Sequence, residues 1–424
     1  MATKKAKGAD EAPKKTADKK GASEAPKKKS VLELVKGMEE GRDITHIELR
    51  ESRSYLSTGC LTLNLIMGGG YYGGRVLQVF GPEHSGKSTL MYTSAADLHR
   101  AGVLTLFFDH EGTTDPKYIK TLGMDISAKS PLFRYYKPKD GNHTYHMMFD
   151  LMNALEDQSE GLPQVCFVID SIATMPAAKE MEEPESKRPA LRASMHSDWW
   201  GKLKTLVSRK HVAVIAVNQV RSTVGMAYGN PETIPGGNAW KFSTDNLVRV
   251  SRVGKHVEVD GDMFQTMRFK TIKNKNFIPS QGAEVYLHLG KGIDPASDVI
   301  TFCKLTGIFH KDGKLPALTG LHADVDGTYK SAADLESAIR ESRATFYEHC
   351  SALIASGKAQ EMYMEKKRNK GAAGESATVT EVGGFDGTYD EAAEDVDSEG
   401  PVPEPDEAEA AAAIAKLKKK KNKS

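Results

Sequence analysis

Nine consecutive residues have the types and spacing needed to bind phosphate. They follow the pattern G-x-x-x-x-G-K-[ST], in which glycines let backbone N–H groups turn toward phosphate oxygens. The lysine can reach the β- and γ-phosphates of a nucleotide, and the serine hydroxyl can bind Mg²⁺. An apolar run precedes the stretch and a helical pattern follows it, a context that an ordinary glycine-rich turn does not require. The residues are Gly81, Pro82, Glu83, His84, Ser85, Gly86, Lys87, Ser88 and Thr89.

Asp170 is the first of two acidic residues that could complete this chemistry. It ends an apolar run at 166–169, as an aspartate at the carboxyl end of a buried strand would. From that position it can hold Mg²⁺ through water or through Ser88.

Glu111 is the second, and it follows another apolar run after Asp109. The carboxyl ends of neighbouring parallel strands meet at one edge of a sheet, where ligands bind. We expect Glu111 to orient or deprotonate an attacking water; the alternative is an ordinary surface glutamate. We expect Asp109 to be structural, and His84 to contribute its backbone rather than its ring.

Apolar, strand-like runs alternate with helical patterns along the chain. This alternation predicts βαβ units and an α/β fold with a mostly parallel central sheet that positions these residues. Segments 179–189 and 221–237 are polar and rich in Gly or Pro, and loops of that length tend to be functional. Later strands are expected, some of them antiparallel, and residues 331–354 read as one helix. The expected strands are 76–80, 103–108, 165–169, 212–217, 246–253, 266–272 and 284–289, and the expected helices are near 87–100, 115–122, 143–158 and 192–209.

Charge is strongly segregated although 58 basic residues nearly balance 57 acidic ones in 424. Residues 1–29 form a basic segment, and 358–424 an acidic and then basic one; both are expected to be disordered tails. Their basic parts could hold phosphate backbones loosely and the acidic part could compete with nucleic acid, or both could simply aid solubility. Between them we expect an oligomerisation helix in 30–44, a core in 45–294 and a small α/β domain in 295–357.

Four cysteines are far apart and lack metal-ligand spacing, and Cys166 reads as a small core residue. The chain shows neither a membrane-length apolar run nor the apolar part of a signal peptide. These features fit a reducing cytoplasm and predict no membrane partner.

The order of further motifs over roughly 30–300 resembles the RecA family of recombinases. Between the phosphate-binding stretch and Lys273-Asn274-Lys275, the run Asn230-Pro231-Glu232-Thr233-Ile234-Pro235-Gly236-Gly237-Asn238-Ala239-Trp240-Lys241-Phe242 is the most specific. The resemblance implies a RecA-like P-loop ATPase core, a short polymerisation helix at 31–38 and a small C-terminal domain. It implies ATP and Mg²⁺ as cofactors, and it implies a helical homo-oligomeric filament on single-stranded DNA that pairs with double-stranded DNA.

The resemblance also assigns roles at the nucleotide. Glu111 matches the catalytic glutamate, and Asp115 and Tyr118 match residues that hold adenine. Gln219 matches the glutamine that senses the γ-phosphate. Lys273 and Lys275 match a pair that reaches the ATP of the adjoining subunit, and Lys241 and Phe242 match interface residues.

Two segments match DNA-binding loops. In the second, 221–237, Arg221 and Tyr228 suit single strands, because a cation and backbone amides meet phosphates while an aromatic ring contacts bases. The first, near 181–189, departs from the bacterial pattern but keeps two basic residues. His84, Gly112 and the extended tails also depart, which indicates a divergent member of the kind that a phage could encode. The expected DNA contacts are Arg221, Tyr228, Gly236, Gly237, Asn238, Lys187 and Arg188.

These features together predict an ATP-dependent recombinase that catalyses homologous pairing and strand exchange. A helicase or other DNA motor on the same core is one alternative, although 1–44 is short for the extra domain that such a motor usually has. An ATP-sensing DNA-binding scaffold is the other, and intact Lys87, Glu111 and Asp170 argue against it.

Overall fold

The computed structural model describes residues 55–127, 130–158, 162–182, 189–222, 232–259 and 261–372. The expected helix at 31–38, the N-terminal tail and the tail beyond 372 therefore lie outside the described residues. Within the described residues, no helix is both long and apolar enough to cross a membrane.

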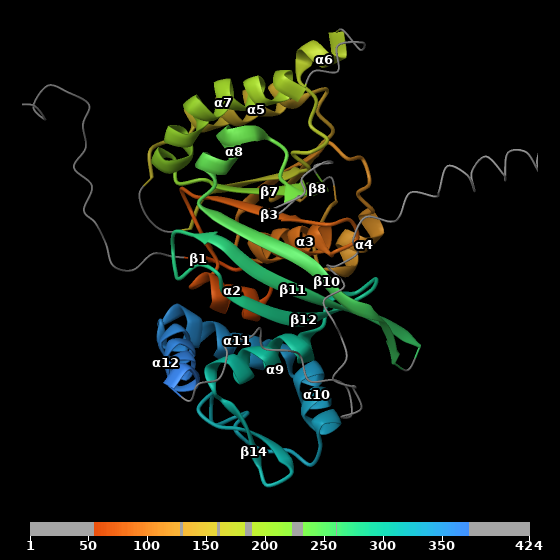
Figure 1. The fold of residues 1–424 in the computed structure, drawn as a ribbon, viewed down its shortest axis with the longest axis vertical. Helices are drawn as coiled ribbons and strands as arrows, with labels where there is room; N and C mark the ends of the chain where they lie inside the picture. Colours follow the sequence, from red (N-terminus) through yellow and green to blue (C-terminus); the bar gives the residue numbers. More distant parts are fainter. Residues whose placement is uncertain are drawn as a thin grey trace, which may run out of the picture. The chain divides into compact units, whose positions relative to one another are not determined.

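A nine-stranded sheet carries the described fold, in the order β13-β12-β11-β10-β3-β7-β6-β4-β5 (Figure 1). The six strands from β10 to β5 pair in parallel, and β11, β12 and β13 add antiparallel neighbours. The strands are β3 (Val76–Gly81), β4 (Leu104–Asp109), β5 (Phe133–Tyr136), β6 (Val165–Asp170), β7 (Ala213–Gln219), β10 (Asn246–Val259), β11 (Asp262–Asn274), β12 (Gly282–His288) and β13 (Gly292–Ile293). The predicted α/β fold and its seven predicted strands are confirmed, while β5 and β13 were not predicted.

Successive strand residues point to opposite faces of the sheet, and each face has its own core. Phe108 and Ile169 join one apolar cluster, whereas Phe107 and Val168 join the other. The first cluster packs under α5 (Gly141–Ala154), α7 (Pro189–Arg209) and α8 (Gly237–Ser243), which lie together on one side of the sheet in Figure 1. Trp200 is 2% exposed there and belongs to the helix core.

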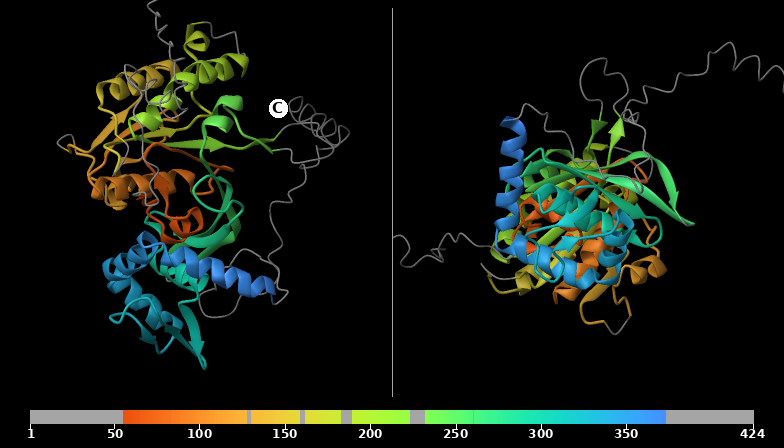
Figure 2. Two further views of the ribbon diagram at one scale, coloured as in Figure 1. Left: turned by 90° about the vertical axis from the view of Figure 1, so that its left-hand side faces the viewer. Right: turned by 90° about the horizontal axis from the view of Figure 1, so that it is seen from below.

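The other face is covered by α2 (Leu61–Met67), α3 (Lys87–Arg100) and the C-terminal helices. α4 (Pro116–Thr121) lies next to α3, and Tyr118 of α4 contacts Tyr92 of α3 edge to face. Two strand pairs of a few residues complete this part of the chain: β1 (Tyr55–Leu56) with β2 (Tyr71–Tyr72), and β8 (Arg221–Ser222) with β9 (Glu232–Thr233). The β10–β11 hairpin pairs as far as Val259 with Asp262 and extends beyond its neighbouring strands (Figures 1 and 2).

Residues 295–372 form α9 (Pro295–Thr306), the small sheet β14 (Phe309–Asp312), β15 (Leu315–Leu318) and β16 (Gly327–Thr328), and three further helices. The single helix predicted at 331–354 is wrong, because Ser342 leaves helical geometry (φ −111°, ψ 35°) and separates α10 (Ala332–Glu341) from α11 (Arg343–Ala355). The apolar cluster runs without a break from α2 into these helices. The division at 294/295 stays a prediction, but the two sides share one core.

The predicted tail from 358 is also wrong at its start, because Lys358–Ala372 form α12, the blue helix in Figure 2. The mostly polar sequence of α12 hides the contacts that hold it. Ala359 and Tyr363 are buried, and the Tyr363 hydroxyl donates to Gln281 at 2.9 Å. Lys366 and Lys367 donate to Lys304 O and to Gln281 Oε1, so their charged ends fasten the helix to the sheet and to α9.

Asp298, on α9, joins the C-terminal helices to the core. Its buried carboxylate accepts the first-turn amides of α2, Leu61 N at 2.8 Å and Thr62 N at 2.9 Å. It also accepts the hydroxyl of Tyr347 from α11 at 2.8 Å and the thiol of Cys60 at 3.2 Å. A helix leaves its first amides without internal partners, and a negative charge suits that end. One side chain therefore holds three helices together.

We expect Asp298→Asn to lower the free energy of unfolding by roughly 2–4 kcal/mol, because its amide nitrogen would face N–H donors in a buried place. Tyr347→Phe, the matched control, removes one of the four donors and should cost only about 1 kcal/mol. Urea unfolding at neutral pH measures both. Equal losses for the two variants would contradict the central role of Asp298.

Candidate nucleotide site and loop bases

The phosphate-binding loop lies at the carboxyl edge of the sheet, between β3 and α3. Gly81 at the end of β3 is in register with Gln219 at the end of β7, and Asp109 is in register with Asp170 one strand further along. Strand pairing alone therefore brings the ends of four strands to one edge. The sequence-predicted residues Gln219 and Asp170 reach that edge as expected from the strand pattern.

Contacts inside the loop hold its shape. The Ser85 hydroxyl donates to Pro82 O at 2.9 Å, and Lys87 Nζ reaches the same carbonyl at 2.5 Å. His84 adopts a left-handed backbone (φ 56°), and its carbonyl accepts from Gln265 of β11 at 3.1 Å. His84 thus contributes backbone to the loop. Gly86 is also left-handed, and an added Cβ would lie 2.8 Å from Met267 Sδ, so this position needs glycine.

Asp109 builds the turn that presents Glu111. Its carboxylate accepts Glu111 N at 2.9 Å and Gly112 N at 2.6 Å, and Tyr135 of β5 donates to its other oxygen at 2.6 Å. Burial alone would raise the pKa of Asp109, but these donors hold it below the ordinary value. Asp109 is therefore an ionised structural residue, and the exposed Glu111 projects from a fixed turn.

The burial and charge environment of Asp170 suit a metal ligand. It is 2% exposed, and its Oδ1 has no hydrogen-bond partner among the described residues. Burial, with the negative charges of Glu111 and Asp109, raises its pKa to about 7, against the opposing effects of Ser88 and Lys87. A buried carboxylate oxygen without a partner next to a P-loop serine fits Mg²⁺, which prefers such hard oxygen ligands.

Lys87 is buried at the start of α3, and burial lowers its pKa although Asp170, Glu111 and Glu83 act in the opposite direction. Those three carboxylates surround the lysine with negative charge. Mg²⁺ at Asp170 and phosphates at the loop would bring cation and anion together in a partly desolvated place, where electrostatic interactions strengthen.

Gln219 and its neighbour Asn218 link this edge to the segment 221–237. Gln219 Nε2 lies 3.4 Å from Glu111 Oε1, at the long end of a hydrogen bond. The buried amide of Asn218 donates to Pro235 O at 2.7 Å, and its oxygen accepts Gln219 N at 3.0 Å. Adjacent residues at the end of β7 thus contact the candidate catalytic carboxylate and the end of that segment.

Asp115 and Tyr118 both lie on or next to α4. Asp115 caps the helix by accepting Lys117 N at 2.8 Å, and its side chain is exposed. The Tyr118 hydroxyl donates to Thr89 of the P-loop at 2.9 Å. Tyr118 therefore lies beside the phosphate-binding loop, while adenine contact by either residue stays a prediction.

The structure describes the residues that flank each of the two expected DNA-binding segments. Strands β8 and β9 pair Arg221 with Thr233 across the second segment. On the two sides of 183–188, Glu180 of α6 (Ala178–Glu182) and Arg192 of α7 form an ion pair at 2.8 Å. Lys187, Arg188 and Tyr228, and the side chain of Arg221, lie outside the described residues, so their DNA contacts stay predictions.

Gly236 and Gly237, at the end of the second segment, pack against residues that flank the first segment. At Gly236 (φ 103°) an added Cβ would lie 2.8 Å from Trp240 Cδ1 and 3.1 Å from Ile172 Cγ2, and at Gly237 it would lie 3.3 Å from Ala193 Cβ. Ile172 follows β6 and Ala193 lies in α7, on either side of the first segment. Both glycines therefore have a packing role at the start of α8, and Asn238 is exposed beside them.

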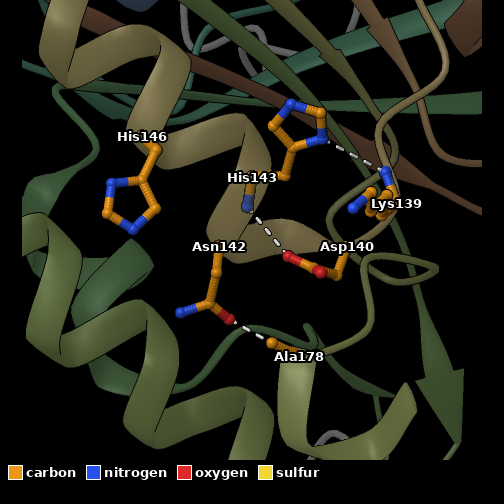
Figure 3. Close-up of a pocket in the computed structure, with 6 residues that line it drawn as sticks. All are labelled: Lys139, Asp140, Asn142, His143, His146 and Ala178. Carbon is orange, nitrogen blue, oxygen red and sulfur yellow. Dashed lines mark hydrogen bonds between the residues drawn. The ribbon is translucent and has the colours of Figure 1, made fainter. Parts of the chain in front are cut away.

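A small concavity of about 270 Å³ lies where α5 begins, next to Ala178 at the start of α6 (Figure 3). Asp140 caps α5 there by accepting His143 N at 2.8 Å, and Asn142 accepts Ala178 N at 3.1 Å. Asn142 thereby anchors α6 to α5.

Lys273 and Lys275 lie at the opposite edge of the sheet from their own P-loop. Lys273 pairs with Leu247 of β10, and Lys275 follows Asn274, whose partner Asn246 lies beside Leu77 near the amino end of β3. Leu77 lies four residues before Gly81, a separation of about 13 Å along the strand. Lys273 Nζ donates to Lys241 O at 3.1 Å and to Thr244 O at 2.5 Å, and so holds the end of α8.

Asp245 organises the charges around Lys275. Its carboxylate is fully buried and accepts Val76 N at 2.9 Å and Lys275 at 2.9 Å, together with Lys204 and Arg75. Burial alone would raise the pKa of Asp245, but the two lysines and the Val76 amide lower it. Nearby Phe242 is 72% exposed and Lys241 is exposed, so this edge presents the two expected interface residues to solvent.

Sequence reasoning missed Tyr135, Asn218, Asp245 and Gln265 as contributors to the site. Asn218 directly follows the expected strand 212–217 and was assigned no role. The partners of Asp245 are 30 to 170 residues away, so nothing local marked it. An asparagine or aspartate that directly precedes or ends a buried strand is the one signal that could have found both.

Comparison of the sequence with known proteins identifies one family. Residues 39–294 match the family model of the RecA N-terminal domain. The chain is 34% identical over 261 residues to Protein RecA of Thermus aquaticus, covering 61% of this chain and 74% of that protein. It is also 34% identical to Protein RecA of Deinococcus radiodurans (61% and 69% covered) and of Aquifex aeolicus (61% and 72%). The crystal structure of the RadB recombinase aligns at 20% identity with a TM-score of 0.42, over 56% of this chain and 98% of that one.

The raised pKa of Asp170 predicts a pH dependence of stability. Because its folded-state pKa, about 7, exceeds the ordinary 3.8, this carboxyl favours the fold below pH 4 and that contribution is lost as the pH rises toward 7. Asp170→Asn should remove a slope of up to about 1.4 kcal/mol per pH unit in that window, measured by urea unfolding without nucleotide or Mg²⁺. The exposed Asp150→Asn on α5 is the control for lost charge. Parallel pH profiles for the natural chain and Asp170→Asn would refute the assignment.

Proposed function

The chain belongs to the RecA family, and on that premise we propose that it is an ATP-dependent DNA recombinase. It assembles as a filament on single-stranded DNA and catalyses homologous pairing and strand exchange with double-stranded DNA. The observation that supports this most is the double link at the end of β7. Gln219 contacts Glu111 while Asn218 holds Pro235 at the end of the segment expected to bind DNA.

In the proposed reaction ATP binds the loop 81–89. Backbone amides and Lys87 hold its phosphates, Ser88 and Asp170 hold Mg²⁺, and Asp115 and Tyr118 hold the adenine. The bound metal neutralises charge on the phosphates. Glu111 orients a water molecule and accepts its proton, since the turn at Asp109 holds its backbone at the edge of the sheet.

The proposed DNA interface is formed by the two segments, whose flanking residues lie next to each other. Lys187 and Arg188 in the first segment and Arg221 and Tyr228 in the second contact the strand, with Gly236, Gly237 and Asn238 at its end. Phosphate contacts of this kind give affinity without reading sequence, which suits an enzyme that must accept any strand. The packing of Gly236 against Ile172 lets one segment respond to the other.

Each ATP site is proposed to be shared between two protomers. Lys273 and Lys275 lie too far from their own P-loop to serve it, but they occupy an edge together with exposed Phe242 and Lys241. A neighbour that places its P-loop against this edge would receive two cations at the γ-phosphate, a role like that of an arginine finger. Contacts with Asp245 and Thr244 O hold the lysines in place before assembly.

The function is tested by strand exchange and by ATP hydrolysis with and without single-stranded DNA. We expect the chain with ATP and Mg²⁺ to exchange homologous strands, and DNA to stimulate hydrolysis. Gln219→Ala should bind ATP and DNA separately but lose most of that stimulation, because the contact with Glu111 is removed. The control is Gln164→Ala, an exposed glutamine that precedes β6 at the other edge. DNA-stimulated hydrolysis without exchange would indicate a motor, binding without hydrolysis would indicate a scaffold, and normal stimulation in Gln219→Ala would disprove the coupling.

Site sharing is tested by mixing two inactive variants. Lys87→Ala lacks the P-loop lysine, and Lys273→Ala/Lys275→Ala lacks the donated pair, so a mixed assembly contains some sites with both halves intact. We expect an equal mixture to recover about a quarter of the natural hydrolysis rate, as random neighbours in a head-to-tail assembly give. Lys87→Ala mixed with Glu111→Gln is the control, since both defects fall on the same half. Equal recovery in both mixtures, or none in the first, contradicts sharing.

A further inference from the structure

Two histidines and an aspartate converge in the C-terminal region, far in the sequence from the P-loop. His322 and Asp324 lie in the loop between β15 and β16, and His349 lies on α11. One ligand atom from each residue lies within 4.8 Å of the others. Asp324 Oδ2 lies 3.1 Å from His322 Nδ1 and 3.9 Å from His349 Nε2. These separations are close to the distance of about 3.4 Å between neighbouring ligands of a tetrahedral cation at 2.0–2.1 Å.

The loop that carries two of these residues is held in place by its own hydrogen bonds. The carboxylate of Asp326 accepts Gly320 N at 2.8 Å, Leu321 N at 3.0 Å and His322 N at 3.3 Å. In return His322 O accepts Asp326 N at 2.8 Å. These contacts fix the backbone of the loop, while the side chain of His322 stays free to turn.

His349 has an unmet polar group that points to a ligand. Its side chain is only 16% exposed, and its Nε2 is buried with no hydrogen-bond partner among the described residues. A buried ring nitrogen normally finds a donor or acceptor, because leaving it unpaired is unfavourable. The Asp324 carboxylate oxygen lies 3.9 Å from this nitrogen, which is too distant for a hydrogen bond. A cation between them would satisfy both.

The stacked rings of His322 and His349 show which side chain must move when a cation binds. The rings of His322 and His349 lie 3.9 Å apart and nearly parallel, at 10°. An imidazole donates a lone pair in the plane of its ring, so two parallel rings cannot both point at one cation. His322 is 48% exposed and can turn, whereas His349 is held within α11. Binding therefore requires His322 to leave the stack.

We propose that His322, Asp324 and His349 bind one late first-row divalent cation of the Zn²⁺ class. Two imidazoles and one carboxylate suit Zn²⁺, Co²⁺ or Ni²⁺, whereas Mg²⁺ and Ca²⁺ prefer all-oxygen sites. Water would take the fourth position. The cation would connect the loop 319–326 to α11 and make this region more rigid, independently of ATP and of the proposed recombinase activity.

The experiment uses the full chain, stripped of metal, titrated with Zn²⁺ alone and then with Co²⁺ as a spectroscopic probe. We expect the natural chain to bind one cation more than His322→Ala, Asp324→Ala or His349→Ala, with the visible absorption of four-coordinate Co²⁺ present only in the natural chain. Affinity at this site should fall more than about tenfold in each variant, since even losing an outer partner of a ligand costs 10–100-fold. His256→Ala, an exposed histidine on β10, is the matched control and should bind as the natural chain does.

His322 and Asp324 are on the surface, so their variants test binding even if His349→Ala unfolds. A change in ATP hydrolysis is not required, which separates this site from the proposed function. The same stoichiometry and Co²⁺ spectrum in all variants, or displacement of Zn²⁺ by excess Mg²⁺, would overturn the proposal. So would the lack of any Zn²⁺ binding by the natural chain.

Discussion

The register of four parallel strands is the constraint on which the rest of the site depends. Strand pairing places Asp109 beside Asp170 and Gly81 beside Gln219. Each of these residues ends a strand whose buried side chains leave no freedom to slip, since a shift of one residue would exchange the two apolar faces. The loop 81–89, the turn that presents Glu111 and the start of the segment 221–237 all begin from those fixed positions. Backbone pairing therefore sets the frame of the site, and side chains such as that of Asp109 shape the turns within it.

Two aspartates at this edge, Asp109 and Asp170, differ in the direction of their pKa shifts. Asp109 is surrounded by donors and stays ionised, whereas Asp170 has few donors, two acidic neighbours and a raised pKa. Two carboxylates in register thus have opposite tasks, one structural and one suited to a metal. At the other edge Asp245 gathers three cations and lowers their mutual repulsion. The sheet separates an acid-rich end from a base-rich end, which is the pattern that a head-to-tail interface needs.

Local motifs predicted the parts of this arrangement that are local. The P-loop, Asp170 and Glu111 were placed by strand ends, and the main strands and helices were confirmed because their apolar periods are regular. The features that the sequence did not predict depend on residues far away in the chain. β5 has exposed residues between its apolar ones, α12 is held by Gln281 and Lys304, and the role of Asp245 rests on Arg75 and Lys204. Ser342 interrupts a helical pattern without a proline or glycine to mark the break.

The position of Lys273 and Lys275, a strand length away from their own P-loop, has a consequence for how activity grows with assembly. Under the proposed sharing, a chain of protomers contains one complete site fewer than it has members, and a lone protomer contains none. The protomer at one end always holds an unfinished pocket, and the one at the other end always holds unused lysines. The two ends are then chemically different, so growth and disassembly at each end obey different rate laws, and the concentration of protein itself acts as a threshold for turnover.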